Sequence, residues 1–219
     1  MIPHMPEAAP RRRRWPWIVL AVVVVLLIPV AVIGIPIITH QNEGSSNQRP
    51  TTVEWPQVAV AVGDDGRERS IKLVASDGGD LDTSALIVGE QLIVRGSGYD
   101  ASQGIYVAIC VIPDDPQTKP GPCIGGVPEQ QQEQAEVEPG TIQYGPSTWI
   151  NDDWAWKLFG ARSYDDVDAG TFTAYLAVGD PVGDGFDCRV DACAIYTRND
   201  HTALGDRVQD LRIPVAFEG

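Results

Sequence analysis

Four cysteines, grouped in two short stretches of strand-like sequence, constrain this chain more than any other feature. Cys110 ends an apolar run and is followed by Cys123, and Cys188 is separated from Cys193 by four residues. An even number of cysteines with such local spacing, downstream of an apolar membrane signal, predicts a disulfide framework outside the cytoplasm. A zinc site is the competing interpretation, but these spacings lack CxxC knuckles and partner histidines. Four cysteines allow three pairings, and the count alone does not choose among them.

The amino-terminal sequence predicts a membrane anchor. Four arginines at 11–14 precede an uncharged apolar run over 15–39. A transmembrane helix over 15–39 would place residues 1–14 in the cytoplasm as a basic tail and the rest of the chain outside, because arginines concentrate on the cytoplasmic side. A cleaved signal peptide is the rival interpretation, but β-branched isoleucines occupy the zone where cleavage needs small residues. We therefore expect a single-pass protein of the cell membrane, in contact with the lipid bilayer through residues 15–39.

The chain beyond the predicted helix is strongly acidic and long enough for one domain. Residues 40–52 are polar without apolar periodicity and predict a flexible tether, and residues 53–219 predict an extracytoplasmic domain. Beyond residue 39 the chain carries 29 acidic and 12 basic residues, a net charge of −17. Nucleic acid is excluded as a partner, because phosphate binding needs clustered Lys and Arg. Solubility beside a membrane explains the charge most simply, and a patch for a basic partner or for cations is the alternative.

Short β-rich runs separated by Gly and Asp turns predict an all-β domain. The seven predicted strands cover residues 58–62, 70–74, 91–95, 105–112, 171–178, 194–198 and 211–217. Strands of this number and punctuation are typical of an antiparallel sandwich. An insert at about 126–164 interrupts them. Its acidic, low-complexity part (129–139) predicts a solvated loop, and its later part (144–164) concentrates aromatic residues.

Several of these runs resemble the chromophore-binding apoproteins of the neocarzinostatin type. The run 89–99 contains Gly96-Ser-Gly98 and is followed by a strand that ends in Cys110, and the match resumes at 168–178, at the closely spaced second cysteines and at 213–217. The resemblance implies a seven-stranded immunoglobulin-like antiparallel sandwich whose two short disulfides lie beside a ligand cleft. It also implies the pairings Cys110–Cys123 and Cys188–Cys193.

The departures from this family concern its ligand. Family members bind an enediyne chromophore against aromatic side chains, one of them two residues after the first cysteine, where this chain has the aliphatic Ile112. The family's long ribbon before the second cysteine pair is shortened here to 179–185. A secreted carrier would also have no use for a membrane anchor. The resemblance therefore implies the sandwich for this chain and does not imply the chromophore.

No combination of residues predicts an enzyme. His201 is interpreted most simply as a turn or capping residue, and no G-x-S-x-G elbow accompanies it. Adjacent acidic pairs do not by themselves give the carboxylate separation of a glycosidase, and none follows the calcium-loop pattern. We expect no catalytic residue, no cofactor and no metal site.

The tryptophan-rich part of the insert is the best candidate for function. Trp149, Trp154 and Trp156, together with Tyr164 and His201, are the candidate contact residues. They either close the end of the sandwich as a structural lid or form a contact surface. We expect a non-enzymatic, membrane-tethered recognition module of an actinobacterial-type cell envelope that docks on a membrane-protein partner. The alternative is a binding protein for an apolar small molecule or glycan in the cleft.

Overall fold

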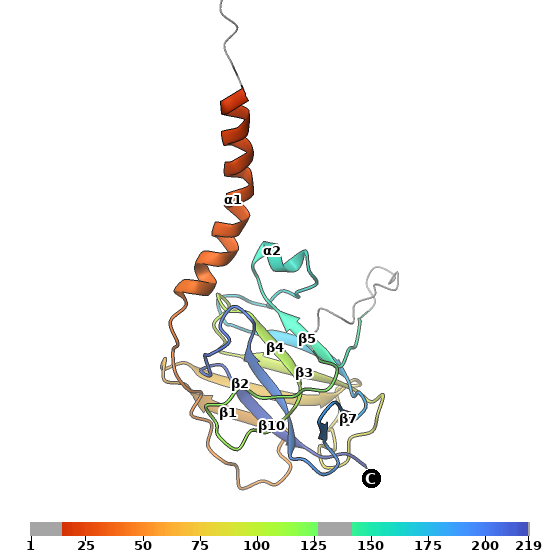
Figure 1. Cartoon of the computed structure of the whole chain (residues 1–219). Helices are drawn as coiled ribbons and strands as arrows, with labels where there is room; N and C mark the ends of the chain where they lie inside the picture. Colours follow the sequence, from red (N-terminus) through yellow and green to blue (C-terminus); the bar gives the residue numbers. More distant parts are fainter. Residues whose placement is uncertain (1–14, 127–141, 219) are drawn as a thin grey trace, which may run out of the picture. The chain divides into compact units, whose positions relative to one another are not determined.

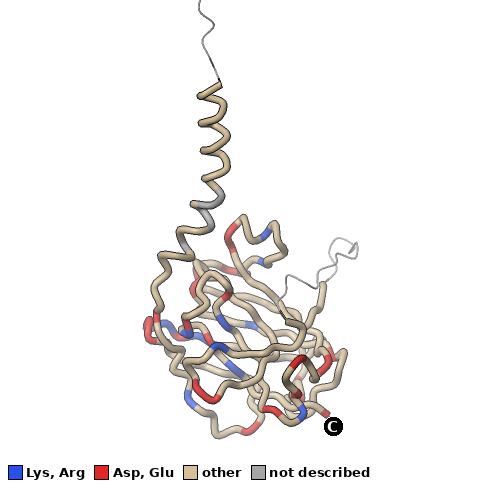
Figure 2. The backbone as a smooth tube through the Cα atoms, in the orientation of Figure 1, with Lys and Arg blue, Asp and Glu red and all other residues tan. Residues whose placement is uncertain are grey.

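The computed structural model describes residues 15–126 and 142–218 and divides the chain into two units, the first ending at Thr39 and the second beginning at His40 (Figure 1). The first unit is a helix, α1 (Trp15–Thr39), that contains no Asp, Glu, Lys or Arg (Figure 2). Among the described residues, no helix combines the length and the hydropathy that crossing a membrane requires. The predicted membrane anchor is therefore not confirmed. The predicted basic tail (1–14) and acidic loop (129–139) lie outside the described residues.

The second unit consists mainly of two four-stranded antiparallel sheets. The first sheet has the strand order β1 (Val58–Val62), β2 (Glu68–Ala75), β3 (Gln91–Ser97), β6 (Phe172–Ala177). The second has the order β10 (Leu211–Val215), β9 (Cys193–Asn199), β4 (Ile105–Val111), β5 (Ser147–Ile150). A two-stranded ribbon joins β7 (Val182–Gly183) to β8 (Phe186–Asp187).

The number of strands differs from the prediction. Each of the seven predicted runs contains a strand, but the described part of the chain has ten strands in three sheets rather than seven strands in two. The three additional strands are β5, inside the insert, and two strands of two residues each: β7, inside the shortened ribbon, and β8, directly after it. Runs of two to four residues are too short to show an alternating pattern, which is why the sequence did not indicate them.

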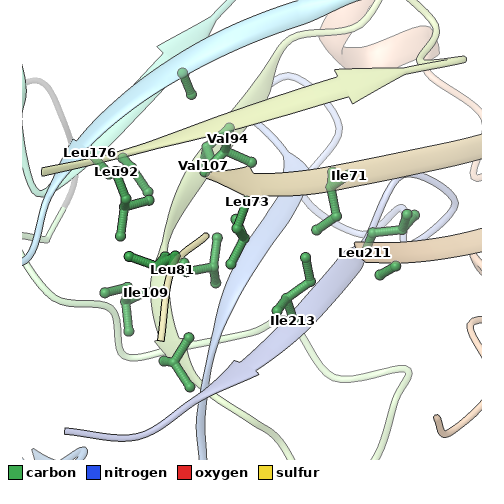
Figure 3. Close-up of a cluster of buried hydrophobic side chains, with 14 of the residues drawn as sticks. Ile71, Leu73, Leu81, Leu92, Val94, Val107, Ile109, Leu176, Leu211 and Ile213 are labelled. Carbon is green, nitrogen blue, oxygen red and sulfur yellow. The ribbon is translucent and has the colours of Figure 1, made fainter. Parts of the chain in front are cut away.

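The core lies between the two large sheets, and alternation along the strands creates it. In β6, Phe172, Ala174 and Leu176 are buried, while the residues between them are partly exposed. Figure 3 shows Leu92 and Val94 of β3 gathered with Val107 and Ile109 of β4. Burying each such side chain contributes on the order of 1.5–3 kcal/mol to folding, so this cluster is the main stabilising element of the domain.

Both predicted disulfides are confirmed. Cys110 is bonded to Cys123 and Cys188 to Cys193, and no cysteine is free. Val111 at the end of β4 pairs with Cys193 at the start of β9. The two bridges therefore lie at the same end of the second sheet.

The segment predicted as a flexible tether is instead bonded to the domain. His40 Nε2 lies 2.9 Å from Asp206 Oδ2. Gln48 exchanges two hydrogen bonds with the backbone of Arg212, donating from Nε2 to its carbonyl and accepting from its amide, each at 2.7 Å. These partners lie more than 160 residues along the chain, so no local pattern could reveal them. The domain begins at His40 rather than at residue 53.

Candidate functional site

The domain has two distinct ends, and each carries a candidate site. Ile105, the first residue of β4, pairs with Asn199, the last residue of β9, at what we call the entry end, where His40 contacts the loop 200–210. The opposite end carries both disulfides, and we call it the disulfide end. Helix α2 (Trp154–Lys157) follows β5 at the entry end, and Figure 1 shows it at the end of the sandwich away from the carboxyl terminus.

Three of the five predicted contact residues meet in one aromatic cluster at the entry end. Trp149 on β5 is only 3% exposed, and its ring centroid lies 5.6 Å from that of Trp156 and 5.3 Å from that of His201. The His201 and Trp156 rings meet edge to face with centroids 4.7 Å apart. Tyr106 of β4 completes the cluster, with its hydroxyl 2.8 Å from His201 Nδ1. The cluster packs the insert against the loop that contains His201.

Asp200 is the polar centre of this cluster. Its Oδ2 accepts hydrogen bonds from Trp149 Nε1 at 2.8 Å and from Asn151 Nδ2 at 2.9 Å. Its Oδ1 accepts from the backbone amide of Thr202 at 2.8 Å and from the hydroxyl of the same residue. The carboxylate is fully buried, and such charge-assisted bonds are among the stronger ones in proteins. Trp149 is thus held by ring contacts with Trp156 and His201 and by the hydrogen bond of its Nε1 to Asp200. These contacts favour a role for Trp149 as a structural lid on the end of the sandwich.

The remaining two predicted residues lie apart from the cluster. Tyr164 is buried in the main core, where its ring stands edge to face with that of Phe172 and its hydroxyl donates to the carbonyl of Gln103 at 3.0 Å. Burial raises the pKa of this phenol well above its ordinary value. Trp154, in contrast, is 67% exposed. Of the three tryptophans named together from the sequence, it is the one whose ring is largely free of the fold.

Trp154 belongs to an exposed apolar surface that the sequence did not single out. Leu158 is 74% exposed and Phe159 64% exposed, both in the turn that follows α2. We call Trp154, Leu158 and Phe159 the apolar tip. A helix of four residues has no periodicity that separates exposed from buried positions, so the pattern could not indicate which aromatic residues point outward.

A cleft of about 470 Å³ lies at the disulfide end. Its apolar lining comes from Cys123, Ile124, Pro146, Val182 and Phe186. Asp180 and Asp184 also line it, together with glycine backbone from 125–126 and 179–183. Small-molecule sites commonly have volumes of 300–1,000 Å³ and this mixture of apolar walls with a few polar groups.

The cleft does not use the residue that the family resemblance indicated. Ile112 packs beside Cys110 and Cys123 and is absent from the cleft lining. The aromatic ring in the cleft is Phe186 on β8, which lies across Gly183; a Cβ on that glycine would be 2.1 Å from the ring. The sequence analysis did not single out Phe186, because nothing in the spacing of this segment reveals where the ring lies.

A buried ion pair lies in the loop 200–210, which also contains His201. Asp210 Oδ2 is 2.7 Å from Nη1 of Arg207, and both side chains are buried. Desolvation raises the pKa of Asp210 to about 7, although Arg207 acts in the opposite direction. In the described part of the chain, no group of three or more His, Cys, Asp or Glu side chains is arranged to hold a metal ion.

Comparisons with known proteins give one distant similarity. No family model matches the chain, and no curated protein matches it. Among solved structures, macromomycin is similar with 17% identity and a TM-score of 0.35, over 67% of this chain and 98% of macromomycin. At this identity and TM-score the similarity carries no argument about the family or the ligand of this chain.

Proposed function

We propose that this chain is a membrane-tethered, extracytoplasmic binding module without catalytic activity, and that it holds an apolar small molecule in the cleft at the disulfide end. The observation that carries the proposal is the cleft itself. Its volume suits a small molecule, and Ile124, Val182 and Phe186 offer it an apolar wall. Asp180 and Asp184 favour a ligand with a basic or hydrogen-bond-donating group beside its apolar part.

The location rests on two features. Disulfides persist in oxidising compartments outside the cytoplasm, and both bridges of this chain are formed. The uncharged apolar sequence of 15–39 follows four arginines, the arrangement of an anchor whose amino side is cytoplasmic. Protease added to intact spheroplasts should then remove the domain, and protection of the domain would contradict this topology.

The docking function expected from the sequence required Trp149, Trp154 and Trp156 on one contact surface. Trp149 is buried, and Trp156 is packed against Trp149 and His201. Only Trp154 of the three is available to a partner. We therefore rest the proposed function on the cleft.

The test compares two tryptophan substitutions. Val182→Trp fills the cleft from its wall, whereas Val190→Trp adds the same ring at an exposed position that does not line it. The full chain and both variants are extracted from the envelope in mild detergent and weighed by native mass spectrometry. We expect a bound small molecule on the unmodified chain and on V190W, and its loss from V182W. Absence of any adduct on the unmodified chain, or equal adducts on V182W, would overturn the cleft as the binding site.

A further inference from the structure

The apolar tip is more than a loosely packed loop. Its three large side chains, Trp154, Leu158 and Phe159, occupy six residues and are each more than 60% exposed. Large apolar side chains that gather on a soluble surface generally mark a contact with another apolar surface. Leu204, in the loop 200–210 at the same end of the domain, is also 51% exposed.

The tip is held rigidly in this exposed position. Asp153 caps α2 by accepting a hydrogen bond from the amide of Ala155 at 2.8 Å. Lys157 is ion-paired with Asp152. Trp156, between these groups, packs into the aromatic cluster against His201. With Trp156 packed inward, the neighbouring apolar side chains lie on the exposed side of this turn.

The chain enters the domain at this same end, and its first residue after α1 already contacts the domain. Helix α1 ends at Thr39, and His40 is already bonded to Asp206. The next residues continue these contacts: Asn42 Nδ2 donates to the carbonyl of Gly205 at 2.8 Å, and the amide of Glu43 donates to Asp206 Oδ2 at 2.9 Å. Leu204 directly precedes these two acceptor residues. The exposed apolar side chains and the point of chain entry therefore belong to one end of the domain.

We propose that the apolar tip and Leu204 insert into the interfacial region of the membrane in which the chain is anchored. This inference rests on the tether of the proposed function, because His40, which is bonded to the entry end of the domain, directly follows the proposed anchor along the chain. Tryptophan prefers this interface, where its ring is buried and its N–H meets the headgroups. The tether supplies a high local concentration, so a few side chains are sufficient for contact.

The composition of the tip favours lipid over a protein partner. A standard protein interface takes about 20–30 residues from each side, and the surface here consists of four apolar side chains. It also offers no free cation, since Lys157 is paired with Asp152, and the domain is strongly acidic. Contact with lipid should therefore depend on apolar burial and not on anionic headgroups.

The test uses the six tryptophans as reporters. The full chain, labelled with 5-fluorotryptophan, is placed in phosphatidylcholine nanodiscs with and without a doxyl-labelled lipid, and each ¹⁹F signal is assigned by a Trp→Phe variant. We expect the doxyl lipid to at least double the line width of Trp154. Trp55 precedes the end of β1 that lies away from the entry end and is also exposed, so its signal should stay sharp. Trp15 and Trp17 of α1 should broaden and report that the helix is embedded.

The outcomes separate the inference from the tether. Broad signals from Trp15 and Trp17 with a sharp Trp154 would overturn the lipid contact and leave the tether standing. Sharp signals from all three would show that the tether itself is wrong, and the inference would fall with it. Broadening of Trp154 only after a membrane-protein extract is added would replace lipid by a protein partner.

A charge-matched pair of variants completes the test. Leu158→Asp with Phe159→Asp removes the apolar neighbours and keeps the Trp154 reporter. Val88→Asp with Val190→Asp introduces the same two charges at exposed positions away from the entry end. We expect the doxyl-induced broadening of Trp154 to fall at least threefold in the first variant and to remain in the second. Equal broadening in both would contradict insertion of the tip.

Discussion

The hydrogen bonds of Asp200 lead to a prediction that a closely matched control can test. The sequence Asp200-His201-Thr202 has a counterpart in Asp100-Ala101-Ser102, since in both turns the aspartate Oδ1 accepts from the amide and the hydroxyl two residues later. The two aspartates differ at their other oxygen. Asp200 Oδ2 binds Trp149 and Asn151 in a buried site, whereas Asp100 Oδ2 has a 3.5 Å contact with the exposed side chain of Arg67.

Replacing each aspartate by asparagine changes one oxygen into an NH₂ donor. At position 200 the new NH₂ group would face either the donors Trp149 Nε1 and Asn151 Nδ2 or the backbone amide of Thr202. In both orientations at least one charge-assisted bond is lost and at least one N–H loses its acceptor. A charge-assisted bond contributes about 1.5–3 kcal/mol, and an unpaired buried donor costs about 1–3 kcal/mol. We therefore expect Asp200→Asn to lower the free energy of unfolding by about 3–5 kcal/mol. At position 100 solvent replaces the lost acceptor, and Asp100→Asn should cost less than about 1 kcal/mol.

The measurement is urea unfolding of the full chain in mild detergent with its disulfides intact, followed by near-ultraviolet circular dichroism. The midpoint and slope of the transition give the free energy for each variant. The indole N–H signal of Trp149 in nitrogen-15 spectra reports the same bond locally and should shift only in D200N. If D200N and D100N cost the same within about 0.5 kcal/mol, Asp200 does not organise the aromatic cluster, and the reasoning is wrong.

Two further predictions concern the pH dependence and the packing of the core. Because the pKa of Asp210 is raised to about 7, the folded chain retains a proton between about pH 4 and pH 7 that the unfolded chain has released. The contribution of Asp210 to stability should fall by roughly 1 kcal/mol per pH unit as the pH rises through this range, and Asp210→Asn should remove that slope; identical slopes in urea unfolding would contradict it. A Cβ on Gly96 would lie 2.1 Å from the ring of Phe172, so Gly96→Ala should lower the unfolding free energy by about 1–3 kcal/mol, and Phe172→Leu in the same chain should recover part of the loss. No recovery would mean that the ring is not what Gly96 accommodates.

The sequence predicted the elements whose pattern is repeated over five or more residues. The seven longer strands alternate or are continuously apolar, and the cysteine spacing with the family resemblance identified both disulfides. The same patterns failed where structure depends on distant partners. Residues 40–48 look like a tether because their hydrogen-bond partners, among them Asp206 and Arg212, lie at the other end of the chain.

Composition predicted where the aromatic cluster lies in the sequence, but it did not predict which of its rings are buried. Concentration of aromatic residues identified the insert, and the cluster does bring Trp149, Trp156 and His201 together. Composition does not say which rings are buried, because the group that holds Trp149 is an acceptor, the carboxylate of Asp200, fifty-one residues away. The exposed Leu158 was missed because the four-residue helix before it is too short to show a periodic pattern.

The separation of the two sites has a consequence for how the proposed module would work. The cleft and the apolar tip lie at opposite ends of the sandwich, and strands β4 and β9 run from one end to the other. If the apolar tip contacts the bilayer as proposed, the cleft at the opposite end of the domain would open away from the membrane, and its ligand would arrive from the aqueous side. Both disulfides reinforce the end of the domain opposite the apolar tip. Variants of the tip should accordingly change lipid contact without changing cleft occupancy, and V182W should do the reverse. A ligand lost in both classes of variant would require a single site and would contradict this division.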